Sequence, residues 1–149
     1  MGETTYDEAT GMQTAVVKVR GGQQMKISMN TTAIMEKQMA AKTFFEYMDA
    51  LGVVMVDFIE PAAEKLMPLV IFKYSEEVRN SACFAVAKLF AAAVKAVTGP
   101  TPLRPPAFAT QLLGPFVDTL LKGLKGEIHS EPRNCMSESL RDLLQVIND

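Results

Sequence analysis

The sequence of 149 residues contains no tryptophan, one histidine and two cysteines. Cys83 and Cys135 are too far apart for the spacing of zinc ligands or of a secreted disulfide framework, and no second histidine accompanies His129. No nucleophile stands beside a base, and Gly21-Gly22 is not followed by the Gly-Lys-Ser/Thr of a phosphate-binding loop. We therefore expect a reducing, intracellular compartment, no enzyme activity, no metal and no cofactor.

The chain also lacks a strong excess of either charge, since 15 Lys and Arg are balanced by 17 Asp and Glu. Its net charge is −2. This balance does not favour nucleic acid or an anionic membrane as a partner. The apolar runs are interrupted by Lys, Glu or Pro well before the roughly 18 residues that a membrane-spanning helix needs. The acidic start MGETTYDEATG is unlike a signal peptide. We expect no membrane partner and no direct contact with nucleic acid.

Hydrophobic residues make up 48% of the chain, which is enough for a core. Residues 1–13 are polar, and we expect them to be disordered or weakly held. In the following TAVVKVRGGQQMKISMN, apolar and polar residues alternate on both sides of Gly21-Gly22, a pattern typical of a β-hairpin. We therefore assign residues 1–30 to a polar N-terminal tail and an extended insertion.

Apolar residues at helical spacing fill the rest of the chain. Ser75, followed by two glutamates, is a typical helix N-cap. Pro68 and Pro115 lie inside apolar runs and should kink the helices that contain them. The proline-rich TGPTPLRPP is a stiff connector. The expected helices cover residues 32–51, 57–73, 75–97, 107–125 and 131–148.

One helix start occurs twice, because residues 75–90 read SEEVRNSACFAVAKLF and residues 130–144 read SEPRNCMSESLRDLL. Pro68 and Pro115 lie 47 positions apart (115 − 68), and helix pairs that recur at about 40–47 residues are typical of HEAT and armadillo arrays. We predict an all-α fold over residues 31–149, an α-α superhelix of about two and a half HEAT repeats whose apolar faces are joined by stacking. An irregular five-helix domain is the alternative.

Residues 11–97 resemble the central HEAT repeats of the β-karyopherins, the importin-β superfamily, and most of all its importin-five-like branch. The similarity rests on the acidic lead-in DEATGMQ with its Gly-Gln-Gln stretch, on the opening NTTAIMEK of the first helix, and on KLMPLV followed by Val-Arg and a helix of small residues. Two departures are that KLMPLV lacks the residue that usually separates Met from Pro, and that TGPTPLRPP does not fit the pattern.

The resemblance implies a fragment of a nuclear import receptor, found in cytoplasm and nucleus and flanked by neighbouring HEAT repeats. Such receptors bind basic cargo proteins, among them ribosomal proteins and histones, on the concave face of the solenoid. Cargo is released when the GTP-bound GTPase Ran engages the parent receptor. The alternative function is a structural HEAT-repeat scaffold of another assembly, such as a phosphatase or a translation-factor platform.

In that family the second helix of each pair lines the concave face. Six residues near the starts of these helices are the candidate cargo contacts: Glu36, Glu76, Glu77, Asn80, Glu131 and Asn134. A row of carboxylates there suits Lys and Arg of a basic signal. A first-turn acid also stabilises the helix dipole whether or not anything binds. The two asparagines are suited to clamping a peptide backbone, or alternatively to bonding a neighbouring loop.

Three further residues receive structural interpretations. Arg79 and Arg133 each precede one of the asparagines, and we expect them to pack between repeats and bond to carbonyls or acidic neighbours. His129 lies between Glu127 and Glu131 in a loop, where we expect it to be solvated.

Overall fold

Two compact units make up the chain, Met1–Lys37 and Gln38–Asp149, and the boundary between them falls inside the first helix. The structure is a computed structural model that describes residues 4–9 and 11–148. It is mostly helical, with a small antiparallel sheet near the N-terminus. Each unit is described by itself.

The first unit contains a three-stranded antiparallel sheet in the order β1-β2-β3. Its strands are β1 (Thr4–Asp7), β2 (Met12–Lys18) and β3 (Gln24–Asn30). Strands β2 and β3 pair from Met12↔Asn30 to Lys18↔Gln24, so the predicted hairpin is confirmed. Its turn contains Gly21 and Gly22 at φ 111° and 81°, a backbone region that glycine adopts readily.

The expectation that residues 1–13 are disordered or weakly held is wrong for the described part of that segment. Strand β1 pairs with β2 from Thr4↔Ala15 to Asp7↔Met12. The segment Thr-Thr-Tyr has high β-propensity, and pairing with β2 satisfies its backbone groups without a large apolar face. The same prediction for residues 1–3 and 10 lies outside the described residues.

Helix α1 (Thr31–Leu51) follows β3 directly. The side chain of Asn30 accepts a hydrogen bond from the Ala33 N–H at 2.9 Å, which satisfies one of the unpaired donors at the helix start. The Thr31 N–H donates to the Gly11 carbonyl at 2.9 Å. These bonds fix the point where extended backbone turns into helix.

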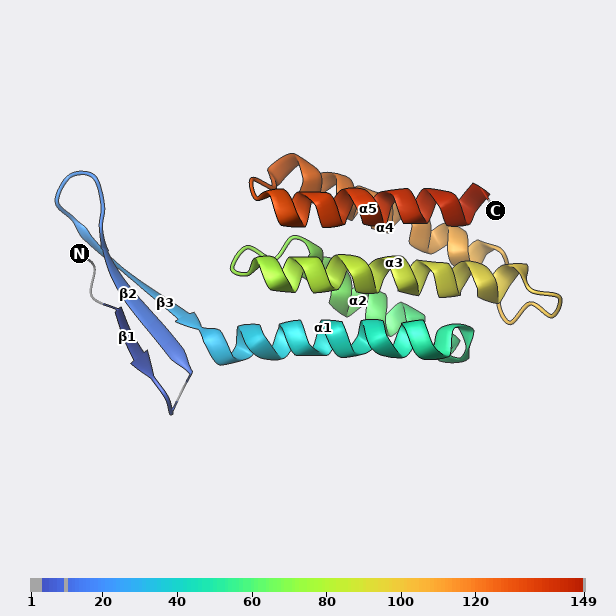
Figure 1. The fold of residues 1–149 in the computed structure, drawn as a ribbon, viewed down its shortest axis with the longest axis horizontal. Helices are drawn as coiled ribbons and strands as arrows, with labels where there is room; N and C mark the ends of the chain where they lie inside the picture. Colours follow the sequence, from blue (N-terminus) through green and yellow to red (C-terminus); the bar gives the residue numbers. More distant parts are fainter. Residues whose placement is uncertain (1–3, 10, 149) are drawn as a thin grey trace. The chain divides into compact units, whose positions relative to one another are not determined.

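The second unit consists of the Gln38–Leu51 part of α1 and four further helices linked by short loops. A 3₁₀ helix η1 (Gly52–Phe58) precedes them, and they are α2 (Ile59–Val70), α3 (Glu76–Thr98), α4 (Ala107–Gly126) and α5 (Ser130–Asn148). Figure 1 shows the end part of α1, α3 and α5 side by side, with α2 and α4 behind them. The second unit is therefore a two-layer helical packing.

The helix bounds differ from the predicted ranges mainly around α2. The predicted helix 57–73 is shorter, because residues 52–58 form the 3₁₀ helix and α2 ends at Val70. Pro68 lies inside α2 near this end, and Pro115 lies inside α4. The remaining helices begin and end within a residue of the expected positions.

Helix α3 lies at the centre of the core and packs against η1, α2, α4 and α5. Phe90 of α3 meets Phe116 of α4 edge to face, with ring centroids 5.8 Å apart, and both rings are fully buried. The Ser139 hydroxyl of α5 donates to the Cys83 carbonyl of α3 at 3.2 Å. Small residues along α3, including Ala82, allow the neighbouring helices to approach closely.

Close packing also explains Gly123 at the end of α4. A Cβ atom at this position would lie 2.8 Å from the sulfur of the buried Met136 on α5. Glycine therefore allows α4 and α5 to meet at this point.

Helix α3 is long and apolar enough to cross a membrane by length and composition, contrary to the expectation from the sequence. Half of its most apolar stretch is buried inside the protein, and a core helix meets the same criterion. Its central place in the helical packing accounts for its composition.

Phe116→Ala tests the importance of the α3–α4 contact. We expect the free energy of unfolding to fall by about 3–5 kcal/mol, because the substitution removes buried area and leaves a cavity beside Phe90. Urea unfolding followed by far-UV circular dichroism measures the change. Phe58→Ala is the matched control, since Phe58 is 59% exposed. A comparable loss in both variants would contradict the central role of this contact.

Candidate functional site

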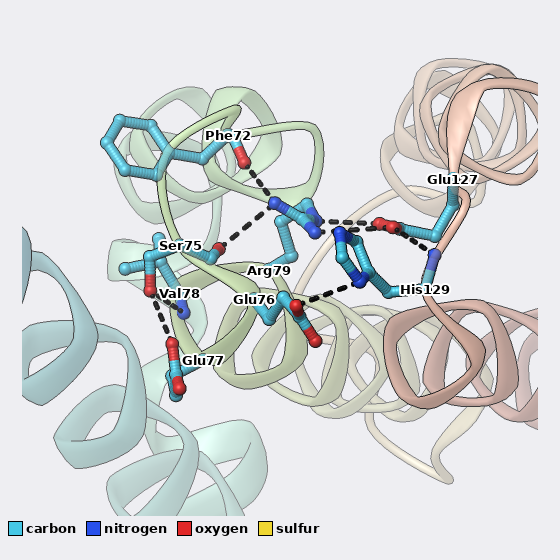
Figure 2. Close-up of polar contacts among 8 residues, drawn as sticks. All are labelled: Phe72, Ser75, Glu76, Glu77, Val78, Arg79, Glu127 and His129. Carbon is cyan, nitrogen blue, oxygen red and sulfur yellow. Dashed lines mark hydrogen bonds and ion pairs between the residues drawn. The ribbon is translucent and has the colours of Figure 1, made fainter. Parts of the chain in front are cut away.

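The starts of α3 and α5, where the candidates Glu76, Glu77 and Glu131 lie, are close together in space. His129 precedes α5, and its Nδ1 lies 3.0 Å from Oε1 of Glu76 in the first turn of α3. Figure 2 shows this contact beside a larger polar network. The expectation that His129 is merely solvated is therefore wrong, although its side chain is half exposed.

A buried ion pair lies at the centre of the network (Figure 2). The Arg79 guanidinium donates from Nε to Oε2 of Glu127 at 2.7 Å and from Nη2 to Oε1 at 3.2 Å. The two residues expose only 8% and 6% of their surface. The two parallel bonds fix the orientation of both side chains.

The third guanidinium nitrogen of Arg79 holds the loop between α2 and α3. Nη1 donates to the Phe72 carbonyl at 2.8 Å and to the Ser75 carbonyl at 3.3 Å. Arg79 thus joins α3 to its own preceding loop and to the loop between α4 and α5. The predicted role of Arg79 in bonding carbonyls and acidic neighbours is confirmed.

The corresponding expectation for Arg133 is wrong. Arg133 is exposed, and within residues 4–9 and 11–148 its side chain forms no hydrogen bond or ion pair. Its place at the start of α5 differs from that of Arg79 because no described helix packs beyond α5, so nothing there excludes water.

Glu127 is held in its charged form. Burial by itself raises the pKa of Glu127, but the His129 N–H and the Arg79 guanidinium together lower it below its ordinary value. The His129 N–H lies 3.0 Å from Oε1 of Glu127. The hydrogen-bond donors around Glu127 thus stabilise its charged form.

Ser75 caps α3 as predicted. Its hydroxyl oxygen accepts from the Val78 N–H at 3.2 Å, and the hydroxyl donates to Oε2 of Glu77 at 2.8 Å. The backbone N–H of Glu77 and the Ser75 hydroxyl lower the pKa of the Glu77 carboxyl. The exposed Glu77 therefore also stabilises the helix start.

The structure places the six candidate residues in different surroundings. Glu77, Glu131 and Asn134 are exposed near the starts of α3 and α5, and Glu76 contacts His129. Asn80 is partly buried, and its Oδ1 is enclosed with no hydrogen-bond partner within the described ranges. Glu36 is exposed on α1 and belongs to the first unit.

Glu127 was missed as a member of the site, because no local pattern marks it. It pairs with Arg79 across 48 positions of the chain. The available signal was indirect: an arginine in the first turn of a largely apolar helix needs a carboxylate when the helix is buried. In the segment GEIHSEP, Glu127 and Glu131 were both available for this role.

The two cysteines are buried thiols in the α3–α5 packing. Burial raises the pKa of Cys83 to about 12, and the nearby Cys135 adds to the shift. Burial also raises the pKa of Cys135, with smaller contributions from the carboxylates of Glu138 and Glu131. Thiols with raised pKa are poor nucleophiles at neutral pH. Among the described residues, no group of three or more His, Cys, Asp and Glu is arranged to hold a metal ion.

The sequence matches no known family model, and a search of curated proteins finds no match. Functional inference therefore rests on the residues and their geometry.

Glu127→Gln tests the buried ion pair. We expect the free energy of unfolding at pH 7 to fall by about 3 kcal/mol, because the Arg79 guanidinium stays buried without its counter-charge. Chemical denaturation of both proteins measures the difference. Glu64→Gln is the matched control, since Glu64 is exposed on α2. An equally small effect in both variants would show that the pair does not stabilise the fold.

The same variant gives a pH prediction. Because the pKa of Glu127 is lowered in the folded state, its contribution is present above the ordinary pKa of 4.5 and is lost as pH falls through the folded pKa below that value. The difference in unfolding free energy between wild type and Glu127→Gln should therefore be constant from neutral pH down to about 5 and shrink in more acidic solution. A difference that grows with acidification would contradict the assignment.

Proposed function

We propose that helices α1 to α5 are successive members of a HEAT-type array, and that the array belongs to a nuclear import receptor. The two-layer packing of the second unit supports this proposal, since consecutive helices alternate between the layers (Figure 1). Helices α3 and α5, which share the Ser-Glu and Arg-Asn pattern, lie side by side in one layer. Stacked helix pairs produce this alternation.

The binding surface in this proposal is the exposed face at the starts of α3 and α5. The single observation that carries it is the close approach of these two starts, seen in the contact between His129 and Glu76. Glu77 is exposed in the first turn of α3, and Glu131 and Glu138 are exposed on the adjacent α5, with the exposed Arg133 between them in sequence. Neighbouring carboxylates attract Lys and Arg side chains of a partner.

Charge along the helices limits this surface to their first halves. Further along α3, Lys88 forms an ion pair with Asp49 of α1 at 2.5 Å, and Lys95 is exposed in the last turns. On α5, Arg141 lies beside Asp142 at 3.5 Å. The second halves therefore carry no excess of negative charge. A basic segment is best accommodated at the amino-terminal ends.

The function we propose is therefore reversible binding of basic cargo segments, of the kind found in ribosomal proteins and histones, by a binding scaffold and not an enzyme. In the parent receptor, release would depend on Ran with bound GTP, and the protein would move between cytoplasm and nucleus. A structural HEAT scaffold of a phosphatase or translation-factor assembly remains the alternative, and it does not require binding of basic peptides.

Peptide binding tests the proposal. A fluorescein-labelled peptide rich in Lys and Arg is titrated with the protein, and fluorescence anisotropy is followed at low and moderate salt. We expect binding that weakens with salt, since exposed charges are screened over about 10 Å at 0.1 M salt. The triple variant Glu77→Gln, Glu131→Gln and Glu138→Gln should weaken binding by about fivefold, because each exposed charge contributes a fraction of a kcal/mol.

A matched variant removes three exposed carboxylates from the other layer: Glu60→Gln, Glu64→Gln and Asp118→Asn. It has the same net charge as the first variant, so general electrostatic attraction is equal in both. We expect its affinity for the peptide to exceed that of the first variant. Equal affinities, or binding that does not respond to salt, would remove the proposed surface and favour the structural scaffold.

A further inference from the structure

A hollow of about 550 Å³ lies between the α2–α3 loop and the α4–α5 loop, beside the buried ion pair. Its lining combines apolar side chains with five ionisable ones: Lys73, Arg79, Lys122, Glu127 and His129. The apolar part includes Ile71 and Phe72 from the first loop and Met136 from α5. Pockets of this size accommodate a bulky side chain together with polar groups.

The charges that remain available in this hollow are positive. Arg79 and Glu127 both line it, but their side chains are bonded to each other and, for Arg79, to two carbonyls. Lys73 lines the hollow from the α2–α3 loop and Lys122 from the last turns of α4, and neither forms an ion pair within the described ranges. A ligand would therefore meet ammonium groups above an apolar floor.

Ile128 adds another apolar side chain to the lining of the hollow, and this residue is 86% exposed. The structure imposes this exposure, because both neighbours in the chain are held. The Glu127 N–H donates to the Gly123 carbonyl at 2.9 Å, and the His129 N–H donates to the Glu127 carboxylate at 3.0 Å. Ile128 is thus fixed in solvent, where a large apolar side chain often marks a contact with a partner.

A second, polar hollow of about 310 Å³ adjoins the first and shares Lys73, Arg79 and His129 with it. Glu76 and Glu77 also line this second hollow. Their carboxylates disfavour an acidic ligand there, so such a ligand is better accommodated in the first hollow.

We propose that the first hollow binds a peptide segment in which a bulky apolar side chain is flanked by carboxylates. The apolar side chain packs on Ile71, Phe72 and Ile128, and the carboxylates pair with Lys73 and Lys122. The ligand of this hollow has the opposite charge to the basic segments proposed for the carboxylates at the starts of α3 and α5.

The test uses a fluorescein-labelled peptide Gly-Ser-Asp-Phe-Glu-Ser-Gly, titrated with the full chain and followed by anisotropy. We expect saturable binding that weakens when the phenylalanine is replaced by alanine or when the acids are replaced by their amides. The variant Lys73→Gln with Lys122→Gln should bind about fivefold more weakly, since two exposed ion pairs are lost. Ile128→Ser should also weaken binding without altering the circular dichroism spectrum, because its side chain is exposed.

Matched controls keep the outcome specific. Lys65→Gln with Lys125→Gln removes two exposed lysines that do not line the hollow, and Val54→Ser replaces another apolar side chain that is 75% exposed. Both controls should bind the peptide like wild type. The proposal is overturned by equal binding of the Lys73/Lys122 and Lys65/Lys125 variants, or by the absence of saturable binding at millimolar protein concentration in low salt.

Discussion

The burial of α3 is the constraint on which the second unit depends. Its side chains from Val78 to Ala96 are largely removed from water, and this apolar surface is covered by the helices around it. Each neighbouring helix is positioned by the part of α3 that it covers, α4 through Phe116 against Phe90 and α5 through Ser139 against the Cys83 carbonyl. The other helices therefore pack around α3 in two layers, and their ends come together at common edges.

One consequence of this burial is electrostatic. Arg79 lies in the first turns of α3, so packing of the helix removes its guanidinium from water as well. A buried charge is tolerated when it is paired and fully hydrogen-bonded, and Glu127 with two backbone carbonyls meets that requirement. Because the partner lies on a loop, the same pair fixes the loop between α4 and α5. The exposed position of Ile128 follows from that.

Local patterns were enough to predict much of the fold. Ser75 marks the start of α3 by a capping preference that acts within three residues, and Gly21-Gly22 marks the hairpin turn by its backbone freedom. Features that depend on distant partners were missed. Strand β1 owes its conformation to pairing with β2, and Glu127 acquires its role from Arg79 at a separation of 48 residues. Exposure on α1 also depends on distant partners, since this helix lies at the edge of the second unit's packing and its Tyr47 is 55% exposed.

The net charge of −2 does not indicate how the charged side chains are distributed around the candidate site. Arg79 and Glu127 neutralise each other. The charged side chains that can still meet a ligand at this edge are therefore the exposed ones outside this ion pair. Carboxylates remain at the starts of α3 and α5, where the positive end of each helix dipole favours them. Lysines remain on the α2–α3 loop and near the end of α4, where the negative end of the helix dipole favours a cation. Alternation of helix direction between the layers thus brings groups of opposite charge to one edge, where Lys73, Glu76 and Glu77 line the same polar hollow.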